Sequence, residues 1–165
     1  MPLITGLLTV FILFFPNDLP TGLAVGTDSR PAEIRTVPLD TLSDLAVAFA
    51  DPIAPVIYFS PRLMRRFGPE ISAFVIVHEH AHIMLGHQRP SGAMSGEEKE
   101  QLLQRWELEA DCLAAAILSR ERPAAVAAAR RHFELMGMNR VDREHPTGQA
   151  RASRIELCSP SDIDD

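Results

Sequence analysis

The chain has 165 residues, of which 46% are hydrophobic and 23% charged, and its formal net charge is −6. This length suits one domain with a hydrophobic core, and this composition excludes bulk disorder. No basic stripe runs along any segment, so the sequence predicts no nucleic-acid partner.

Residues 1–26 are expected to serve as a signal peptide or a membrane anchor. Leu3 to Phe15 is nearly unbroken in apolar character. It is shorter than the roughly 20 residues of a spanning helix and fits the apolar core of a secretory signal. Residues 24–26 are small enough for a cleavage site. An exported protein (periplasmic or extracellular) or a membrane-tethered one, associated through residues 3–15, is therefore expected in preference to a cytoplasmic one. The alternatives are a buried N-terminal element or a misassigned start.

Residues 27–54 are predicted to form a linker and a first helix. The helix is expected from Leu39 to Ala50, because apolar residues recur at 42, 45, 46 and 49. The β-branched and aromatic run from 55 to 60 predicts a strand, closed by Pro61, and Val56–Ser60 is the clear candidate for an edge strand. A second strand is expected around Ile34 to Leu39.

Residues 55–158 are predicted to form the main domain, and residues 159–165 an acidic tail. Proline and glycine residues mark the ends of its helices. Cys112 and Cys158 are the only cysteines. They would pair in an exported protein, or stay as two buried thiols. The expected fold class is mainly α (α+β), with helices over 61–67, 70–85, 96–120, 123–137 and 146–157.

The run His78-Glu79-His80-Ala81-His82 indicates a metal site. Two histidines four residues apart lie about 40° apart around a helix, one turn above the other, so both imidazoles reach one ion. Zn²⁺ suits two imidazoles and a carboxylate, and a catalytic site leaves its fourth position for water. Glu79 lies beside the histidines, where its carboxylate contacts that water and acts as a catalytic base.

The next long helix offers the third ligand. Glu107 and Asp111 are also four residues apart and share a helix face. Glu107 is expected to complete the ligands of one Zn²⁺ per chain. Asp111 is expected to accept a hydrogen bond from the far nitrogen of a ligand histidine, which fixes the tautomer of that histidine. His87, which follows Gly86, is expected at the surface.

The pattern His78-Glu79-x-x-His82 followed by Glu107-x-x-Ala110-Asp111 resembles the HtpX and CAAX prenyl-protease-like family of gluzincin metallopeptidases. The apolar approach from Phe74 and the segment His145-Pro146 with Arg151 and Arg154 are similar too, so the resemblance covers roughly residues 55–158. It implies a compact, single-domain, zincin-like fold, in which the first helix packs against the second beside a small edge β element. It also implies that His78, His82 and Glu107 bind zinc, that Glu79 is the general base and that Asp111 supports a ligand.

The predicted function is therefore zinc-dependent endopeptidase activity on a protein or peptide substrate. His145 is a further candidate catalytic residue, near the metal or the developing oxyanion, or else a residue at a helix start. Arg151 and Arg154 either pair with carboxylates of the site or lie on the surface. Two alternatives stay open: a cytosolic regulatory metallopeptidase similar to the ImmA/IrrE group, and a zinc-binding scaffold without turnover.

Overall fold

Three short strands and five helices follow one another in the computed structural model, which describes residues 33–87 and 94–159. The prediction of a mainly α fold with a small β element is confirmed. The apolar run 3–15, the rest of residues 1–26 and most of the acidic tail lie outside the described residues. The elements are β1 (Arg35–Pro38), β2 (Ala46–Phe49), β3 (Val56–Phe59), α1 (Pro61–Phe67), α2 (Pro69–Met84), α3 (Gly96–Glu121), α4 (Pro123–Met136) and α5 (Gly148–Cys158).

The strands form one sheet in the order β1-β3-β2, with β1 parallel and β2 antiparallel to β3. The strand predicted at 55–60 therefore exists, but its expected edge position is wrong, because β3 is central. Val56 and Ile57 of β3 are buried, as a strand with a neighbour on either side requires. The edges fall to β1, which contains Pro38, and to β2.

The helix predicted from Leu39 to Ala50 is wrong. A turn begins at Leu39, where the backbone carbonyl of Leu39 accepts a hydrogen bond from the amide of Leu42 at 3.1 Å. The chain then continues into β2. The apolar positions fit a helical period, but Val47 and Phe49 also alternate along a strand. Pairing with β3, in the register Ala46 opposite Phe59, decides between the two.

Helices α1 and α2 begin and end where the sequence indicated. The Ser60 hydroxyl accepts from the Leu63 amide at 3.5 Å and caps α1, and Pro61 is its first residue. Gly68 has a φ of +85°, a conformation that side chains with a Cβ disfavour, and Pro69 then begins α2. The central helix α2 buries Phe74, His78 and Ala81.

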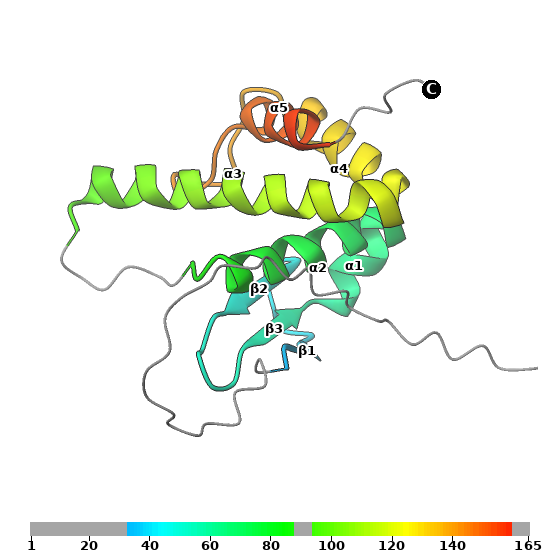
Figure 1. Ribbon diagram of the computed structural model, residues 1–165, viewed down its shortest axis with the longest axis vertical. Helices are drawn as coiled ribbons and strands as arrows, with labels where there is room; N and C mark the ends of the chain where they lie inside the picture. Colours follow the sequence, from blue (N-terminus) through cyan, green and yellow to red (C-terminus); the bar gives the residue numbers. More distant parts are fainter. Residues whose placement is uncertain (1–32, 88–93, 160–165) are drawn as a thin grey trace, which may run out of the picture. The chain divides into compact units, whose positions relative to one another are not determined.

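Helix α3 packs against α2 on one side and against α5 and α4 on the other (Figure 1). Its buried face is rich in alanine, which lets the helix axes approach closely. Gly148 at the start of α5 is required by a similar approach, since a Cβ there would lie 2.4 Å from the Phe133 carbonyl. The core around these helices contains Phe74, Leu118, Val126, Phe133 and Ile155.

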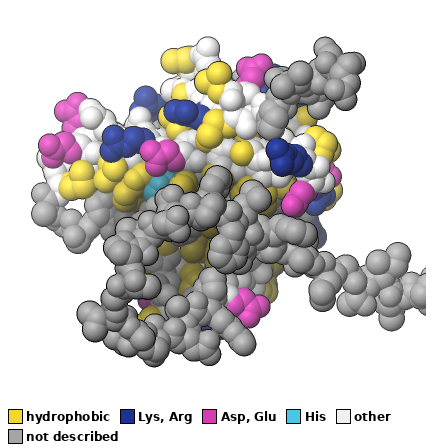
Figure 2. Space-filling model, in the orientation of Figure 1, with side chains coloured by type: hydrophobic (Ala, Val, Ile, Leu, Met, Phe, Trp, Pro, Cys, Tyr) yellow, Lys and Arg dark blue, Asp and Glu magenta, His cyan; other side chains and the backbone are white. Residues whose placement is uncertain are grey.

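A disulfide between Cys112 and Cys158 joins α3 to the last residue of α5. Of the two alternatives left by the sequence, pairing is the one found. Among the described residues, no helix has the length and apolar character needed to cross a membrane. On the face in Figure 2, acidic and basic side chains are interspersed among hydrophobic ones.

Candidate metal centre

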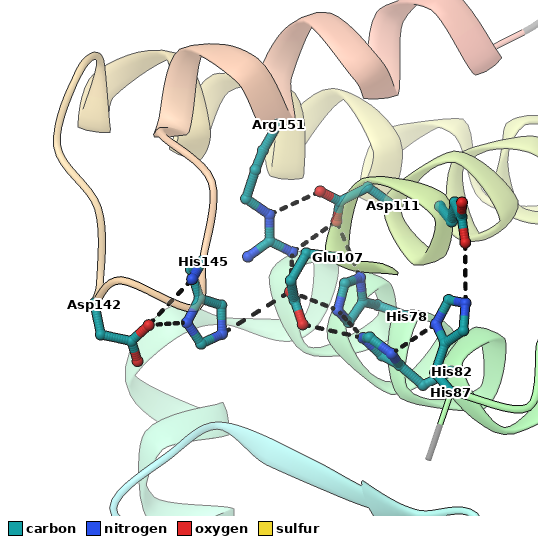
Figure 3. Close-up of polar contacts among 9 residues, drawn as sticks. His78, His82, His87, Glu107, Asp111, Asp142, His145 and Arg151 are labelled. Carbon is teal, nitrogen blue, oxygen red and sulfur yellow. Dashed lines mark hydrogen bonds and ion pairs between the residues drawn. The ribbon is translucent and has the colours of Figure 1, made fainter. Parts of the chain in front are cut away.

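His78 and His82 lie on consecutive turns of α2, and Glu107 faces them from α3 (Figure 3). The two Nε2 atoms are 3.0 Å apart. Oε2 of Glu107 is 3.3 Å from Nε2 of His78, and Oε1 is 3.2 Å from Nε2 of His82. The three residues that the sequence assigned as ligands therefore present their donor atoms to one point, as a group able to hold a metal ion.

The spacing of these donor atoms suits a tetrahedral metal. Ligands at about 2.0–2.1 Å from a tetrahedral ion lie about 3.3 Å from one another. The two Nε2 atoms, 3.0 Å apart, are close to this spacing, and they lie 3.3 and 3.2 Å from different oxygens of Glu107, Oε2 for His78 and Oε1 for His82. The side chains are 6%, 14% and 16% exposed for His78, His82 and Glu107, so the site is sheltered. The fourth position has no protein ligand in this group.

Asp111 lies behind His78, as the sequence predicted. Its Oδ1 atom is 3.0 Å from Nδ1 of His78, within ion-pair distance, although the N–H direction of the ring is not aligned for a hydrogen bond. Asp111 is fully buried. Arg151 donates from Nε to Oδ2 and from Nη2 to Oδ1, both at 2.7 Å, and so compensates the buried charge.

Arg151 is more deeply involved in the site than the sequence indicated. It is buried, its Nη2 atom lies 3.5 Å from Oε2 of Glu107, and its guanidinium stacks 4.1 Å from the centre of the Phe133 ring. Of the two alternatives for the arginines, Arg151 pairs with carboxylates and Arg154 is exposed. Arg151 and Arg154 are three residues apart on α5 and so lie on neighbouring turns. Their spacing alone does not indicate which of the two is buried; the packing of α5 decides it.

The charges of the site shift the pKa values of its members. Burial opposes the charged form of His78, but Glu107 and Asp111 outweigh it and raise the pKa of His78 to about 10. Burial also opposes ionisation of Glu107 and Asp111. Their carboxyl pKa values are nonetheless lowered, by His78 for Glu107 and chiefly by Arg151 for Asp111. Without a metal, the cluster is thus a network of paired charges.

His145 lies beside Glu107 and lines the same cleft as the candidate metal ligands. Its Nε2 atom is 3.9 Å from Oε2 of Glu107, and its Nδ1 atom is 2.7 Å from Oδ1 of Asp142. The same Oδ1 accepts from the backbone amides of Glu144 and His145 at 2.8 and 3.1 Å, which fixes the loop before α5. The sequence suggested His145 but not Asp142, whose three-residue spacing from His145 was the available signal.

A cleft of about 630 Å³ opens onto the candidate metal ligands. Glu79 lines it together with His78, His82, Glu107 and His145. Residues 45–48, which include most of β2, also line it, as do residues of α4 and of the loop before α5. Apolar side chains of α1, α2 and α4 also line the cleft: Leu63, Phe67, Ile71, Phe133 and Met136.

The expectation that His87 lies at the surface is wrong. Its side chain is 5% exposed, and its Nδ1 atom is 3.1 Å from Nδ1 of His82. The signal in the sequence was Gly86, because a glycine after a helix commonly folds the following residue back onto the last turn.

No protein-family model, curated protein or solved structure matches this chain. The geometry of the site therefore carries the functional argument.

Proposed function

We propose that the chain is a zinc-dependent endopeptidase with a zincin-like arrangement of α2, α3 and the sheet. The observation that carries the proposal is the group His78, His82 and Glu107, with Glu79 in the same cleft. Two imidazoles and one carboxylate are a usual ligand set of catalytic Zn²⁺. A zinc site used only for folding has no need of a carboxylic acid beside its ligands in an open cleft. The likeness of its motifs to HtpX and CAAX prenyl-protease-like enzymes agrees with this proposal.

Each residue has a defined task in the proposed reaction. Zinc, when bound, supplies Lewis acidity to a water molecule and to the scissile carbonyl. Glu79 accepts the proton of the attacking water and passes it to the leaving amine. Asp111, held by Arg151, keeps Nδ1 of His78 protonated, so that Nε2 stays free to bind the metal.

His145 is assigned to the developing oxyanion. Asp142 orients its ring through the 2.7 Å contact with Nδ1, and Nε2 then faces the cleft. When both ring nitrogens carry protons, the imidazolium donates to Asp142 through Nδ1 and to the substrate oxygen through Nε2.

The substrate is proposed to be an extended segment of a peptide or protein. Strand β2 is at one edge of the described sheet, pairs with β3 and lines the cleft beside Glu79. A peptide can add to such an edge through main-chain hydrogen bonds. The apolar part of the lining, with Phe67, Ile71 and Phe133, would take an apolar side chain of this peptide.

Export is the proposed localisation, since disulfides persist in oxidising compartments and are rare in the cytosol. The bond between Cys112 and Cys158 thus favours an exported peptidase over a cytosolic regulatory enzyme similar to the ImmA/IrrE group.

The test is hydrolysis of an unfolded protein substrate by the purified chain. We expect activity that a chelator abolishes and zinc restores. Glu79→Gln is expected to retain zinc and to lose about 10²–10⁴-fold in turnover. Glu121→Gln, at an exposed position at the end of α3, is the matched control and should keep full activity. Full turnover in Glu79→Gln would refute the base assignment, whereas a zinc-loaded wild type without any turnover would favour the scaffold.

A further inference from the structure

The end of α2 folds back on the second zinc-ligand candidate. Gly86 has a φ of +67°, and its amide donates to the Ile83 carbonyl at 3.1 Å. The amide of His87 donates to the carbonyl of His82 at 2.9 Å. These two hydrogen bonds form a Schellman motif, in which the residue after the glycine lies against the residue five positions earlier. In helices with this motif the contact is frequently hydrophobic, whereas in this chain it joins His82 and His87.

The imidazole of His87 has a partner for one ring face and for each of its two nitrogens. Its ring stacks on that of Trp106, with centroids 4.9 Å apart and planes 8° from parallel. Nδ1 is 3.1 Å from Nδ1 of His82 (Figure 3), and Nε2 is 3.1 Å from Oε2 of Glu109. Only 5% of the His87 side chain is exposed, so these contacts are shielded from solvent.

Only one placement of protons satisfies these contacts once Nε2 of His82 binds a metal. His82 must then carry its proton on Nδ1, and this N–H donates to Nδ1 of His87. The proton of His87 is consequently on Nε2, from which it donates to the carboxylate of Glu109. Each donor meets an acceptor, so the row from His82 through His87 to Glu109 defines both tautomers without an additional charge.

We propose that His87 is a positioning residue for the metal centre, which fixes the tautomer and the ring orientation of His82 through this hydrogen bond. The inference rests on the metal-binding part of the proposed function and not on peptide hydrolysis. It gives the two ligand histidines separate supports. His78 is supported by the buried pair of Asp111 and Arg151. His82 is supported by His87, whose ring stacks on Trp106. The other ring nitrogen of His87 contacts the half-exposed carboxylate of Glu109.

The experiment measures the affinity of the full, disulfide-bonded chain for Zn²⁺ by competition with a chromophoric chelator. His87→Phe keeps a flat ring for Trp106 but removes the acceptor of His82, and we expect affinity to fall about 10–100-fold. His87→Asn places an amide oxygen where Nδ1 lay and should restore part of that loss. His80→Phe is the matched control, because His80 makes no hydrogen bond or ion pair with the cluster among the described residues; its affinity should stay within about twofold of wild type.

A second readout reports the tautomer directly. In the zinc-loaded chain with ¹⁵N-labelled histidine, the Nδ1–H of His82 should be protected from exchange with water in the wild type and in His87→Asn. In His87→Phe this protection should disappear. Circular dichroism of all variants checks that the fold is kept.

The outcomes separate this inference from the proposed function. Unchanged zinc affinity in His87→Phe, or an equal loss in His80→Phe, would overturn the role of His87. A wild type that binds no zinc would overturn both the inference and the metal site. If the His87 variants behave as expected but Glu79→Gln still hydrolyses peptides, only the assignment of the base is lost.

Discussion

Arg151 of α5 donates two hydrogen bonds of 2.7 Å to the carboxylate of Asp111 on α3. Asp111 is fully buried and Arg151 is 9% exposed, so each is the main partner that compensates the charge of the other. The opposite side of Asp111 faces the ring of His78. The pair thus links the packing of α5 to the position of a metal-ligand candidate.

Removing the arginine is expected to destabilise the protein strongly. Arg151→Met removes both hydrogen bonds to the buried carboxylate of Asp111 and leaves it only the ion pair with His78, which costs about 3–5 kcal/mol in the free energy of unfolding. The double variant Asp111→Asn with Arg151→Met should recover part of this, because the uncompensated charge is gone. Urea denaturation measures all three proteins. Arg154→Met, at the exposed position one turn away, is the control and should change stability by less than about 0.5 kcal/mol. An equal effect of both arginine variants would contradict this account.

Glu107→Ala is expected to remove stoichiometric zinc from the purified protein. The two imidazoles that remain are too few to hold a catalytic Zn²⁺ tightly. Metal content by mass spectrometry after dialysis measures the effect, with Glu121→Ala as the control on the same helix. Equal zinc in the two variants would exclude Glu107 from the ligands.

Local signals predicted the five helices and the candidate metal site because both depend on short spacings. A proline begins each of three helices: Pro61, Pro69 and Pro123. Proline suits the first position of a helix because the amide proton that it lacks has no partner within the helix there. Four-residue spacing along α2 and along α3 places each pair on one face, so the approach of His82 and Glu107 requires only that those faces meet.

The errors lie where distant segments decide the structure. Residues 46–49 form a strand because β3 pairs with them, and no property of that segment alone separates a strand from a short helix. The burial of Arg151 likewise depends on α5 packing against α3, 40 residues earlier. The error for His87 is different, because Gly86 at the helix end was a local signal from which its position could have been predicted.

Zinc binding is expected to release a proton near neutral pH. In the metal-free site Glu107 and Asp111 outweigh burial and raise the pKa of His78 to about 10, so His78 is protonated at pH 7. The metal needs the lone pair that this proton occupies, so affinity should rise about tenfold per pH unit between pH 6 and 8. Calorimetry in buffers of different ionisation enthalpy measures the release, expected to be about one proton per zinc. No release at pH 7 would contradict the charged state of His78.

The same pKa gives the metal-free protein a dependence of stability on pH. Above pH 6.5 the folded chain keeps the His78 proton that the unfolded chain loses, so this contribution is complete below pH 6.5 and disappears as the pH approaches 10. The free energy of unfolding of the metal-free chain should therefore fall across this window. Zinc-loaded protein, in which the metal replaces the proton, is the control and should not show this fall.

Reduction of the disulfide is expected to weaken both stability and the metal site. Cys112 and Cys158 are separated by 46 residues, and opening a loop of this length costs about 2–4 kcal/mol in the free energy of unfolding. Cys112 directly follows Asp111, and Cys158 ends the helix that carries Arg151, so a loosened α5 frees the arginine that compensates Asp111. We therefore expect reductant to lower the midpoint of thermal unfolding and to weaken zinc binding together. The double variant Cys112→Ser and Cys158→Ser should show both defects without reductant and no further change with it. If that variant loses stability but binds zinc as tightly as the wild type, α5 holds Arg151 in place without the disulfide, and the coupling between the bond and the metal site is disproved.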